Sequence, residues 1–288
     1  MTVAAEQDAP RAVLISGCSS GIGLAAAHRL RALGYRVFAT ARKQPDVDAL
    51  LAQGFESLQL DLDDSRSIEE AVNEVLARTG GRLYGLFNNG AYGQQGAVED
   101  LRREVLRAQF ETNLFGWLEL TNRIVPVMRR QGEGRIIQNS SVLGLVTLRF
   151  RGAYNASKFA LEGLTDTLRQ ELRGSGVFVS LIEPGPIESR FRANAYAAYR
   201  RNIDREHSVH REAYLRMEKR LTKEGEAVPF TLPAEAVVKK LIHALESPRP
   251  RVRYYVTVPT YVFAFLKRLL PHGALDGVLQ LASRGENR

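Results

Sequence analysis

Tyr154 and Lys158 are the two residues of this sequence whose types and spacing best fit proton chemistry. They stand four residues apart in a segment with helical periodicity, so the phenol and the ammonium would share one face of a helix. A free phenol has a pKa of about 10 and is a poor acid–base catalyst at neutral pH. A neighbouring cation stabilises the phenolate and lowers that pKa, so the pair predicts an acid–base site.

Ser141 adds a hydroxyl group to this pair. It follows an apolar strand expected over residues 135–139, and it precedes Tyr154 by thirteen positions (154 − 141). A tyrosine four residues before a lysine is common by chance, so the upstream serine at a strand end makes the pattern more specific. The three side chains together predict a reaction centre at the edge of a sheet.

A glycine-rich turn predicts a phosphate site near the start of the chain. Residues 16–23 read S-G-C-S-S-G-I-G between the first expected strand and the first expected helix. Glycines let the backbone approach phosphates, and a helix N-terminus offers unpaired N–H groups and the positive end of its dipole. A tight turn that only packs a helix onto a sheet is the alternative. The residues expected to hold a dinucleotide are Gly17, Ser19, Ser20, Gly21, Ile22 and Gly23.

The end of the second expected strand predicts which dinucleotide binds. An acidic residue there would bind a ribose 2′-hydroxyl and repel a 2′-phosphate, whereas a basic residue does the reverse. The sequence continues Thr40-Ala41-Arg42-Lys43, with no acid before Asp46. Arg42 therefore favours NADP(H), and a solvated turn charge is the alternative.

Apolar runs and helix-period segments alternate along most of the chain. Continuous runs of valine, isoleucine and leucine are typical of parallel strands covered on both faces. The pattern predicts an α/β fold of the doubly wound Rossmann type, with a mainly parallel seven-stranded sheet and helices on both faces. The expected strands are 12–16, 35–40, 57–60, 83–87, 135–139, 177–182 and 253–258. The expected helices are 22–33, 47–53, 65–78, 101–130 (interrupted or kinked near Pro126) and 154–173.

We expect a single domain over residues 1–288, because no flexible linker or repeat is visible. Within it, the cofactor-binding part covers about 11–140 and the catalytic part 141–187. Residues 188–232 depart from the alternation and predict a helical lid over the substrate site, and 253–288 form a C-terminal tail.

The composition excludes several classes of protein. The net charge of +8 is scattered through periodic segments without a zinc-finger or RNA-binding signature, so no nucleic acid is expected. Cys18 is the single cysteine, which excludes an intrachain disulfide and fits a cytoplasmic protein. His207 and His210 share H-x-x-H spacing without an acidic partner cluster, so no metal is expected. The first residues lack the apolar core of a signal peptide.

Ordered motifs between residues 12 and 189 resemble the short-chain dehydrogenase/reductase family. Beyond the features above, they are Asp61-Leu62, Asn88-Asn89-Gly90-Ala91, Asn113 and Pro184-Gly185. From the fourth strand onward the pattern is nearest to the hydroxysteroid and retinol dehydrogenase members. The resemblance implies the same Rossmann fold and a homodimer or homotetramer.

The resemblance also implies a role for each of four catalytic residues. Tyr154 would donate the proton in carbonyl reduction and accept it in alcohol oxidation, and it would also contact the cofactor. Ser141 would orient the substrate oxygen, and Lys158 would lower the tyrosine pKa and hold the nicotinamide ribose. Asn113 would hold a water molecule that links Lys158 to solvent.

Further residues would complete the cofactor site by the same resemblance. Asp61, followed by Leu62, would face the adenine, and Asn89 would shape the cofactor site and the central sheet. Pro184, Gly185 and Ile187 would lie along the nicotinamide, with Ser189 in place of the usual threonine that binds its amide. Glu183 departs from the family pattern, in which asparagine is frequent before Pro-Gly.

These observations predict an NADP(H)-dependent oxidoreductase that interconverts a carbonyl and an alcohol on a small hydrophobic substrate. A steroid, a retinoid or another lipid-like molecule fits the resemblance. A 3-oxoacyl-carrier-protein reductase is the alternative enzyme, and a non-catalytic NADPH-binding regulator is the alternative from another class.

Residues 261–270 (YVFAFLKRLL) are apolar and aromatic, with bases toward the end. Three roles remain open for this segment: a cap over the substrate pocket, a contact with a second subunit, or a peripheral contact with a membrane surface. The segment is too short to span a bilayer, which takes about 20 apolar residues. We therefore expect a cytoplasmic protein, associated with a membrane surface only under the third role.

Overall fold

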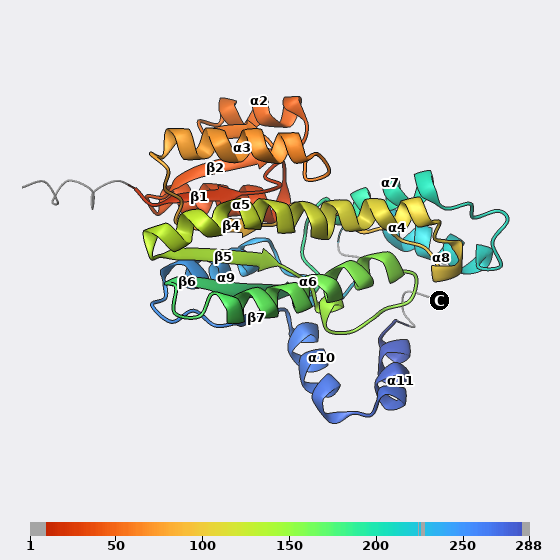
Figure 1. Ribbon diagram of the computed structural model, residues 1–288. Coiled ribbons are helices and arrows are strands. Elements are labelled where there is room, and N and C mark those ends of the chain that lie inside the picture. Colours follow the sequence, from red (N-terminus) through yellow and green to blue (C-terminus); the bar gives the residue numbers. More distant parts are fainter. Residues whose placement is uncertain (1–9, 224, 226–227, 284–288) are drawn as a thin grey trace, which may run out of the picture.

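The computed structural model describes residues 10–223, 225 and 228–283. A seven-stranded sheet runs through them in the order β3-β2-β1-β4-β5-β6-β7, and all neighbouring strands are parallel (Figure 1). The expected doubly wound Rossmann-type fold is confirmed. The strands are β1 (Ala12–Ile15), β2 (Arg36–Ala41), β3 (Glu56–Gln59), β4 (Gly85–Asn88), β5 (Gly134–Asn139), β6 (Val177–Pro184) and β7 (Arg253–Val256).

Helices cover both faces of the sheet, because successive strand side chains point to opposite sides. In β1, Val13 and Ile15 belong to one apolar core, whereas Leu14 belongs to the other. The first core is closed by α1 (Gly21–Ala32), α2 (Gln44–Ala52) and α9 (Glu235–Glu246). The second core is closed by α3 (Ser65–Arg78), α5 (Gly116–Gln131) and α6 (Gly152–Glu171).

The strand order reverses between β1 and β4, so the loops that follow these two strands diverge at the carboxyl edge. Such a switch point is where open α/β sheets bind ligands. The glycine turn follows β1 and Asn89 follows β4. The topology therefore brings the two segments, far apart in the sequence, to one edge of the sheet.

The long helix expected over 101–130 consists of three segments, and the interruption expected near Pro126 is not found. It is made of α4 (Arg103–Phe110), a π turn, η2 (Glu111–Phe115), and α5, which continues through Pro126. The departure from α geometry lies at Glu111–Phe115, just before Gly116. A Cβ at Gly116 would lie 2.1 Å from the carbonyl oxygen of Leu62, so close packing against a distant loop coincides with the irregular turn.

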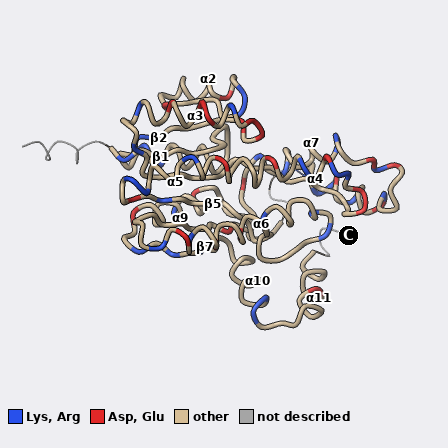
Figure 2. The backbone as a smooth tube through the Cα atoms, viewed as in Figure 1, with Lys and Arg blue, Asp and Glu red and all other residues tan. Residues whose placement is uncertain are grey.

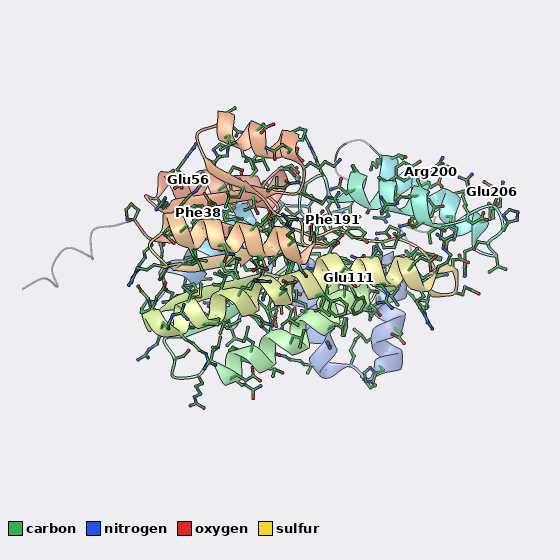
Figure 3. All side chains as sticks on the ribbon, turned by 45° about the horizontal axis from the view of Figure 1, so that its top comes forward. Phe38, Glu56, Glu111, Phe191, Arg200 and Glu206 are labelled. Carbon is green, nitrogen blue, oxygen red and sulfur yellow. The ribbon has the colours of Figure 1, made fainter. Side chains whose placement is uncertain are left out.

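The segments expected as a lid (188–232) and a tail (253–288) both contain helices in the part that the structure describes, and β7 begins the tail. The lid contains α7 (Phe191–Asn202) and α8 (Arg211–Thr222), which pack on each other through Tyr199, Tyr214 and Met217. Figure 3 places Phe191 at the inner end of the lid, beside the sheet, and Arg200 and Glu206 toward its outer end. After β7, α10 (Val258–Leu269) and α11 (His272–Ser283) form a hairpin that projects from the sheet body (Figure 1). Among the described residues, no helix has the length and apolarity needed to cross a bilayer.

Candidate active site

A cavity of about 680 Å³ opens at the carboxyl edge of the sheet, between the strand ends and the lid. It joins the glycine turn, the ends of β4, β5 and β6, and the inner end of α7 into one space. The expected site residues that line it are Gly17, Ser19, Ser20, Gly21, Ile22, Asn89, Ser141, Tyr154, Lys158, Pro184, Gly185, Ile187 and Ser189.

The glycine turn is packed so tightly that side chains do not fit at two of its positions. Gly17 has a φ of +73°, and a Cβ there would lie 2.6 Å from the Cα of Gly90. A Cβ on Gly23 would lie 2.2 Å from the carbonyl oxygen of Gly17. Gly23 therefore lets α1 pack closely against the turn, and the first residues of α1, Gly21 and Ile22, line the cavity. The first turn of α1 has neither an acidic residue nor a side-chain cap, so its N–H groups suit a phosphate.

Asn89 fastens the glycine turn to the neighbouring strands. Its amide nitrogen Nδ2 donates to the carbonyl oxygens of Ser16 and Gly17, each at 3.1 Å. Its Oδ1 accepts a hydrogen bond of 2.9 Å from Nδ2 of Asn139, at the end of β5. The Asn89 side chain thus joins the turn after β1 to the end of β5.

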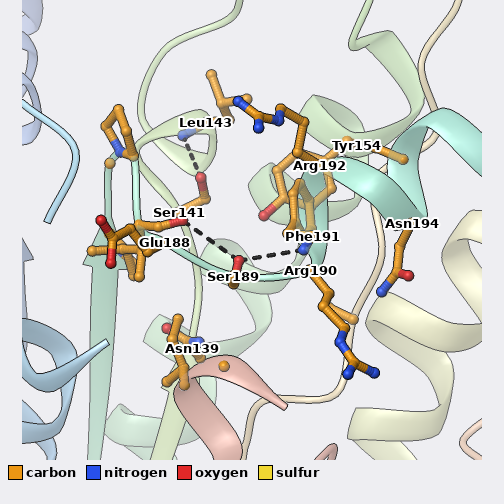
Figure 4. Close-up of a pocket in the computed structure, with 18 of the residues that line it drawn as sticks. Asn139, Ser141, Leu143, Tyr154, Glu188, Ser189, Arg190, Phe191, Arg192 and Asn194 are labelled. Atoms are coloured by element: carbon orange, nitrogen blue, oxygen red, sulfur yellow. Dashed lines mark hydrogen bonds between the residues drawn. The ribbon is translucent and has the colours of Figure 1, made fainter. Parts of the chain in front are cut away.

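The hydroxyl groups of Tyr154 and Ser141 lie next to each other in the wall of the cavity. Ser141 begins a short helical turn, η3 (Val142–Gly144), where its Oγ accepts the Leu143 N–H at 3.1 Å (Figure 4). Tyr154 lies in the first turn of α6 and is 8% exposed. Burial raises the pKa of Tyr154 to about 12, and a hydrogen bond with the Ser141 hydroxyl offsets part of this rise. At neutral pH Tyr154 is a phenol with a proton to donate.

Lys158 is buried one helical turn after Tyr154. Its Nζ donates to the carbonyl oxygen of Asn139 at 2.8 Å and lies 4.2 Å from the centre of the Trp117 ring. Burial lowers the pKa of Lys158 to about 7, and the negative charge of Glu162 acts in the opposite direction. The lowering of the Tyr154 pKa expected from the lysine is not found, because burial penalises the charged forms of both groups.

Asn113 lies in the π turn and ties it to two other segments. Its Oδ1 accepts the Tyr92 N–H at 3.2 Å, and its Nδ2 donates to the Tyr92 carbonyl oxygen at 2.9 Å and to Ser157 Oγ at 3.2 Å. The side chain is fully buried and does not line the cavity. Its expected role in holding a water molecule near Lys158 stays a prediction.

Three other expected cofactor residues lie outside the cavity wall. Arg42 directly follows β2 and is exposed, and its charge acts on Asp63 and Tyr92. Asp61 follows β3, and its carboxylate accepts the Asp63 N–H at 3.1 Å; Leu62 beside it is buried. All three residues stand at the carboxyl ends of β2 and β3, the side of the site expected to take the adenosine half of the cofactor.

The segment after β6 is held by backbone hydrogen bonds with Leu232 and by a side-chain hydrogen bond of Ser189. The Glu188 N–H donates to the Leu232 carbonyl oxygen at 3.0 Å, and the Leu232 N–H donates to that of Pro186 at 3.2 Å. Ser189 Oγ accepts the Phe191 N–H at 3.3 Å where α7 begins (Figure 4). The start of the lid is therefore anchored directly beside the glycine turn, since a Cβ at Gly21 would contact that of Ser189 at 3.0 Å.

Several wall residues, among them residues of the lid, were not predicted from the sequence. The Phe191 ring meets the Tyr154 ring edge-on, with centroids 5.3 Å apart. The R-F-R-A-N run after Ser189 was the available signal, but a helical pattern does not indicate which face meets the cavity. The other missed wall residues include Leu143, Leu148, Arg151, Arg190, Arg192, Asn194 and Arg220.

A partly buried cluster of charged residues near Lys158 includes Glu183, which departs from the family pattern. Arg253 of β7 binds the carboxylates of Glu162 and Glu183, and its Nη2 donates to Asp166 at 2.6 Å. Glu183 is 0% exposed, and burial together with the charge of Glu162 raises its pKa above the usual range of a carboxyl group. The acidic residue at this position thus joins β6 to β7 and α6 through one guanidinium.

A family model described as short chain dehydrogenase matches residues 11–200, which hold the glycine turn, Ser141, Tyr154 and Lys158. The chain belongs to the short-chain dehydrogenase family. The family resemblance stated from the motifs is confirmed, and with it the enzyme class, an oxidoreductase.

Two curated relatives show how far the likeness to this family extends. An uncharacterized oxidoreductase of Escherichia coli, YbbO, is 44% identical over 270 residues, which cover 94% of each chain. Human 17-beta-hydroxysteroid dehydrogenase type 1 is 35% identical over 260 residues, or 85% of this chain and 77% of the relative.

Two solved structures show the same fold. A short-chain dehydrogenase of Streptomyces avermitilis superimposes with a TM-score of 0.73 at 27% identity, covering 96% of both chains. A variant of actinorhodin polyketide ketoreductase in complex with NADPH gives a TM-score of 0.71 at 27% identity, covering 86% of this chain and 95% of that one.

Proposed function

We propose that this chain is an NADP(H)-dependent carbonyl reductase for a hydrophobic ketone or aldehyde, with Tyr154 as the proton donor. The observation that carries the proposal is the buried Tyr154 phenol beside the Ser141 hydroxyl in the wall of the cavity. A phenol kept neutral at physiological pH is ready to donate to a carbonyl oxygen, whereas alcohol oxidation would need the phenolate. This arrangement favours the reductive direction.

The residues around the cofactor site fit nicotinamide adenine dinucleotide phosphate, NADP(H). The glycine turn admits no side chain at Gly17 or Gly23, and the uncapped N-terminus of α1 suits the pyrophosphate. Arg42 stands at the carboxyl end of β2, where a cation would bind a ribose 2′-phosphate. Asp61, Asn89, Ile187 and Ser189 would complete the site as the family resemblance implies. The related ketoreductase is bound to NADPH.

Bound NADPH would supply the hydride that the carbonyl carbon accepts. The Ser141 hydroxyl would hydrogen-bond the carbonyl oxygen and hold it toward Tyr154. The phenol would then give its proton to that oxygen, so that the carbonyl becomes an alcohol and Tyr154 a phenolate. A protonated Lys158, fixed to the Asn139 carbonyl, would stabilise this phenolate.

The substrate end of the cavity supports a hydrophobic molecule. Its wall there includes Val142, Leu143, Leu148 and Phe191, which offer apolar surface next to Tyr154. Among its relatives, the human one acts on hydroxysteroids by name. A steroid, a retinoid or a long-chain lipid carbonyl is therefore the proposed substrate class.

A second candidate is a reductase for 3-oxoacyl groups on a carrier protein. Arg190 and Arg192 line the cavity and would suit a phosphate-bearing carrier arm, and a polyketide ketoreductase shares the fold. A carrier-linked substrate would extend past these arginines, whereas a free lipid carbonyl would lie inside the apolar wall.

The test is NADPH oxidation by the full-length protein with a graded panel of carbonyl compounds. The panel contains cyclic ketones of increasing ring number, aldehydes of increasing chain length and a 3-oxoacyl thioester, each assayed with NADPH and with NADH. We expect kcat/KM to rise with apolar size and to be higher with NADPH. Preferential reduction of the thioester would establish the second candidate, and the absence of turnover on the whole panel would oppose a reductase.

A further inference from the structure

Helix α10 presents a continuous apolar stripe to solvent. Val258, Tyr261, Val262, Phe265 and Leu269 are 55%, 50%, 44%, 61% and 62% exposed. Their spacing of three, four, seven and eleven residues from the first places them on one face of the helix. Single exposed apolar residues are ordinary, whereas five large ones in one stripe mark an interaction surface.

The opposite face of α10 packs in an apolar cluster with residues that line the substrate cavity. Phe263, Leu266 and Leu270 pack with Val142 and Leu148 in one apolar cluster, together with Leu275 and Leu279 of α11. Both Val142 and Leu148 line the cavity. The exposed stripe is therefore separated from the substrate site by one helix, about 10 Å thick.

The charges around the stripe fit an anionic partner. The described part of the hairpin carries Lys267 and Arg268 against Asp276, a balance of 2 − 1 = +1. Figure 2 shows the hairpin largely without charge, with the basic residues at the end of α10. Arg268 borders the stripe, so a twofold contact between two copies of this face would bring like charges together. The whole chain carries +8, which also favours an anionic surface.

We propose that the exposed face of α10 docks on the surface of an anionic lipid bilayer. Tyr261 and Phe265 would enter the interface between headgroups and acyl chains, where aromatic side chains are favoured, and Arg268 would meet lipid phosphates. The cavity behind α10 would then open close to the layer that dissolves hydrophobic carbonyls. Docking itself is independent of catalysis, and only the delivery of substrate rests on the proposed function.

The experiment is co-sedimentation of the full-length protein with vesicles of phosphatidylcholine, with and without phosphatidylglycerol. We expect binding to the anionic vesicles at low salt, weaker binding at high salt, and a loss of at least about tenfold in partitioning for Phe265→Glu. Leu51→Glu is the matched control, because Leu51 is 49% exposed on α2, far from the stripe along the sheet. This variant should bind as the wild type does.

Two readouts separate failure of docking from failure of the proposed function. Reduction of a water-soluble ketone should be equal in wild type and Phe265→Glu, whereas reduction of a vesicle-dissolved ketone should fall only in the variant. Wild-type protein that stays in solution with anionic vesicles at low salt would overturn the docking proposal. A wild-type dimer that Phe265→Glu converts to a monomer would overturn it in favour of a second copy of the chain.

Discussion

The ammonium nitrogen of Lys158 lies 2.8 Å from the carbonyl oxygen of Asn139, so the N-terminal half of α6 is tied to the end of β5. Ser141 follows Asn139 by two residues, and Tyr154 precedes Lys158 by one helical turn. This bond therefore links the segments that carry the two hydroxyls proposed to bind the substrate oxygen. Asn139 also donates to Asn89, which extends the same framework to the glycine turn.

Replacing Tyr154 with phenylalanine should remove turnover and leave the fold intact. The ring still fills its buried position against Phe191, but no proton can be donated. We expect kcat to fall by at least about a hundredfold, the usual contribution of a general acid, with NADPH affinity unchanged. Steady-state NADPH oxidation and cofactor fluorescence measure the two quantities. Tyr35→Phe, at the opposite end of the sheet, is the control, and full activity of Tyr154→Phe across the panel would refute the assignment.

The rate of reduction should depend on the charge of Lys158. Its pKa of about 7 means that the ammonium is present below this pH and is lost as the pH rises through it. We expect kcat/KM for reduction to decrease above about pH 7, since the phenolate then loses its stabilising cation. In Lys158→Arg the side chain stays charged, so the decrease should move to higher pH. Lys43→Arg should keep the wild-type profile, and a wild-type profile that is flat from pH 6 to 9 would contradict this role.

Arg42 should determine the preference for NADPH over NADH. Arg42→Glu replaces a cation at the end of β2 with a group that repels a 2′-phosphate and binds ribose hydroxyls. The ratio of kcat/KM for NADPH over NADH should fall at least about tenfold, equivalent to ~1.4 kcal/mol. Arg29→Glu, exposed near the C-terminal end of α1, provides a charge-matched control. An unchanged ratio in Arg42→Glu would mean that Arg42 is only a solvated turn charge.

Two glycine substitutions should have opposite effects on stability. In Gly23→Ala the new Cβ would lie 2.2 Å from a carbonyl oxygen, so the turn must shift, at a cost of about 1–3 kcal/mol and with weaker cofactor binding. In Gly163→Ala, on the exposed face of α6, no atom lies within 4 Å of the new Cβ. That variant should be more stable by about 0.5–1 kcal/mol, because alanine favours a helix. Thermal unfolding and NADPH titration measure both effects, and equal destabilisation of the two variants would disprove the steric account.

Local patterns in the sequence determined the alternation of strands and helices, the glycine turn and the Tyr154–Lys158 pair. Each of these depends on spacing between neighbours along the chain, such as the four residues that bring two side chains to one helix face. The same rules predicted an interruption of the long helix at Pro126, where α5 is continuous, because proline is only a local signal. The π turn before Gly116 accompanies a close approach to Leu62, a residue more than fifty positions away.

Tertiary structure alone decided the electrostatics of the site and the residues of its wall. The pKa changes of Tyr154 and Lys158 come chiefly from burial, which no spacing in the sequence reveals. The pairing of Glu183 with Arg253 joins residues 70 positions apart, and the contact of Phe191 with Tyr154 joins the lid to α6. Such contacts follow from how distant segments pack together, so they emerge only when the whole chain is folded.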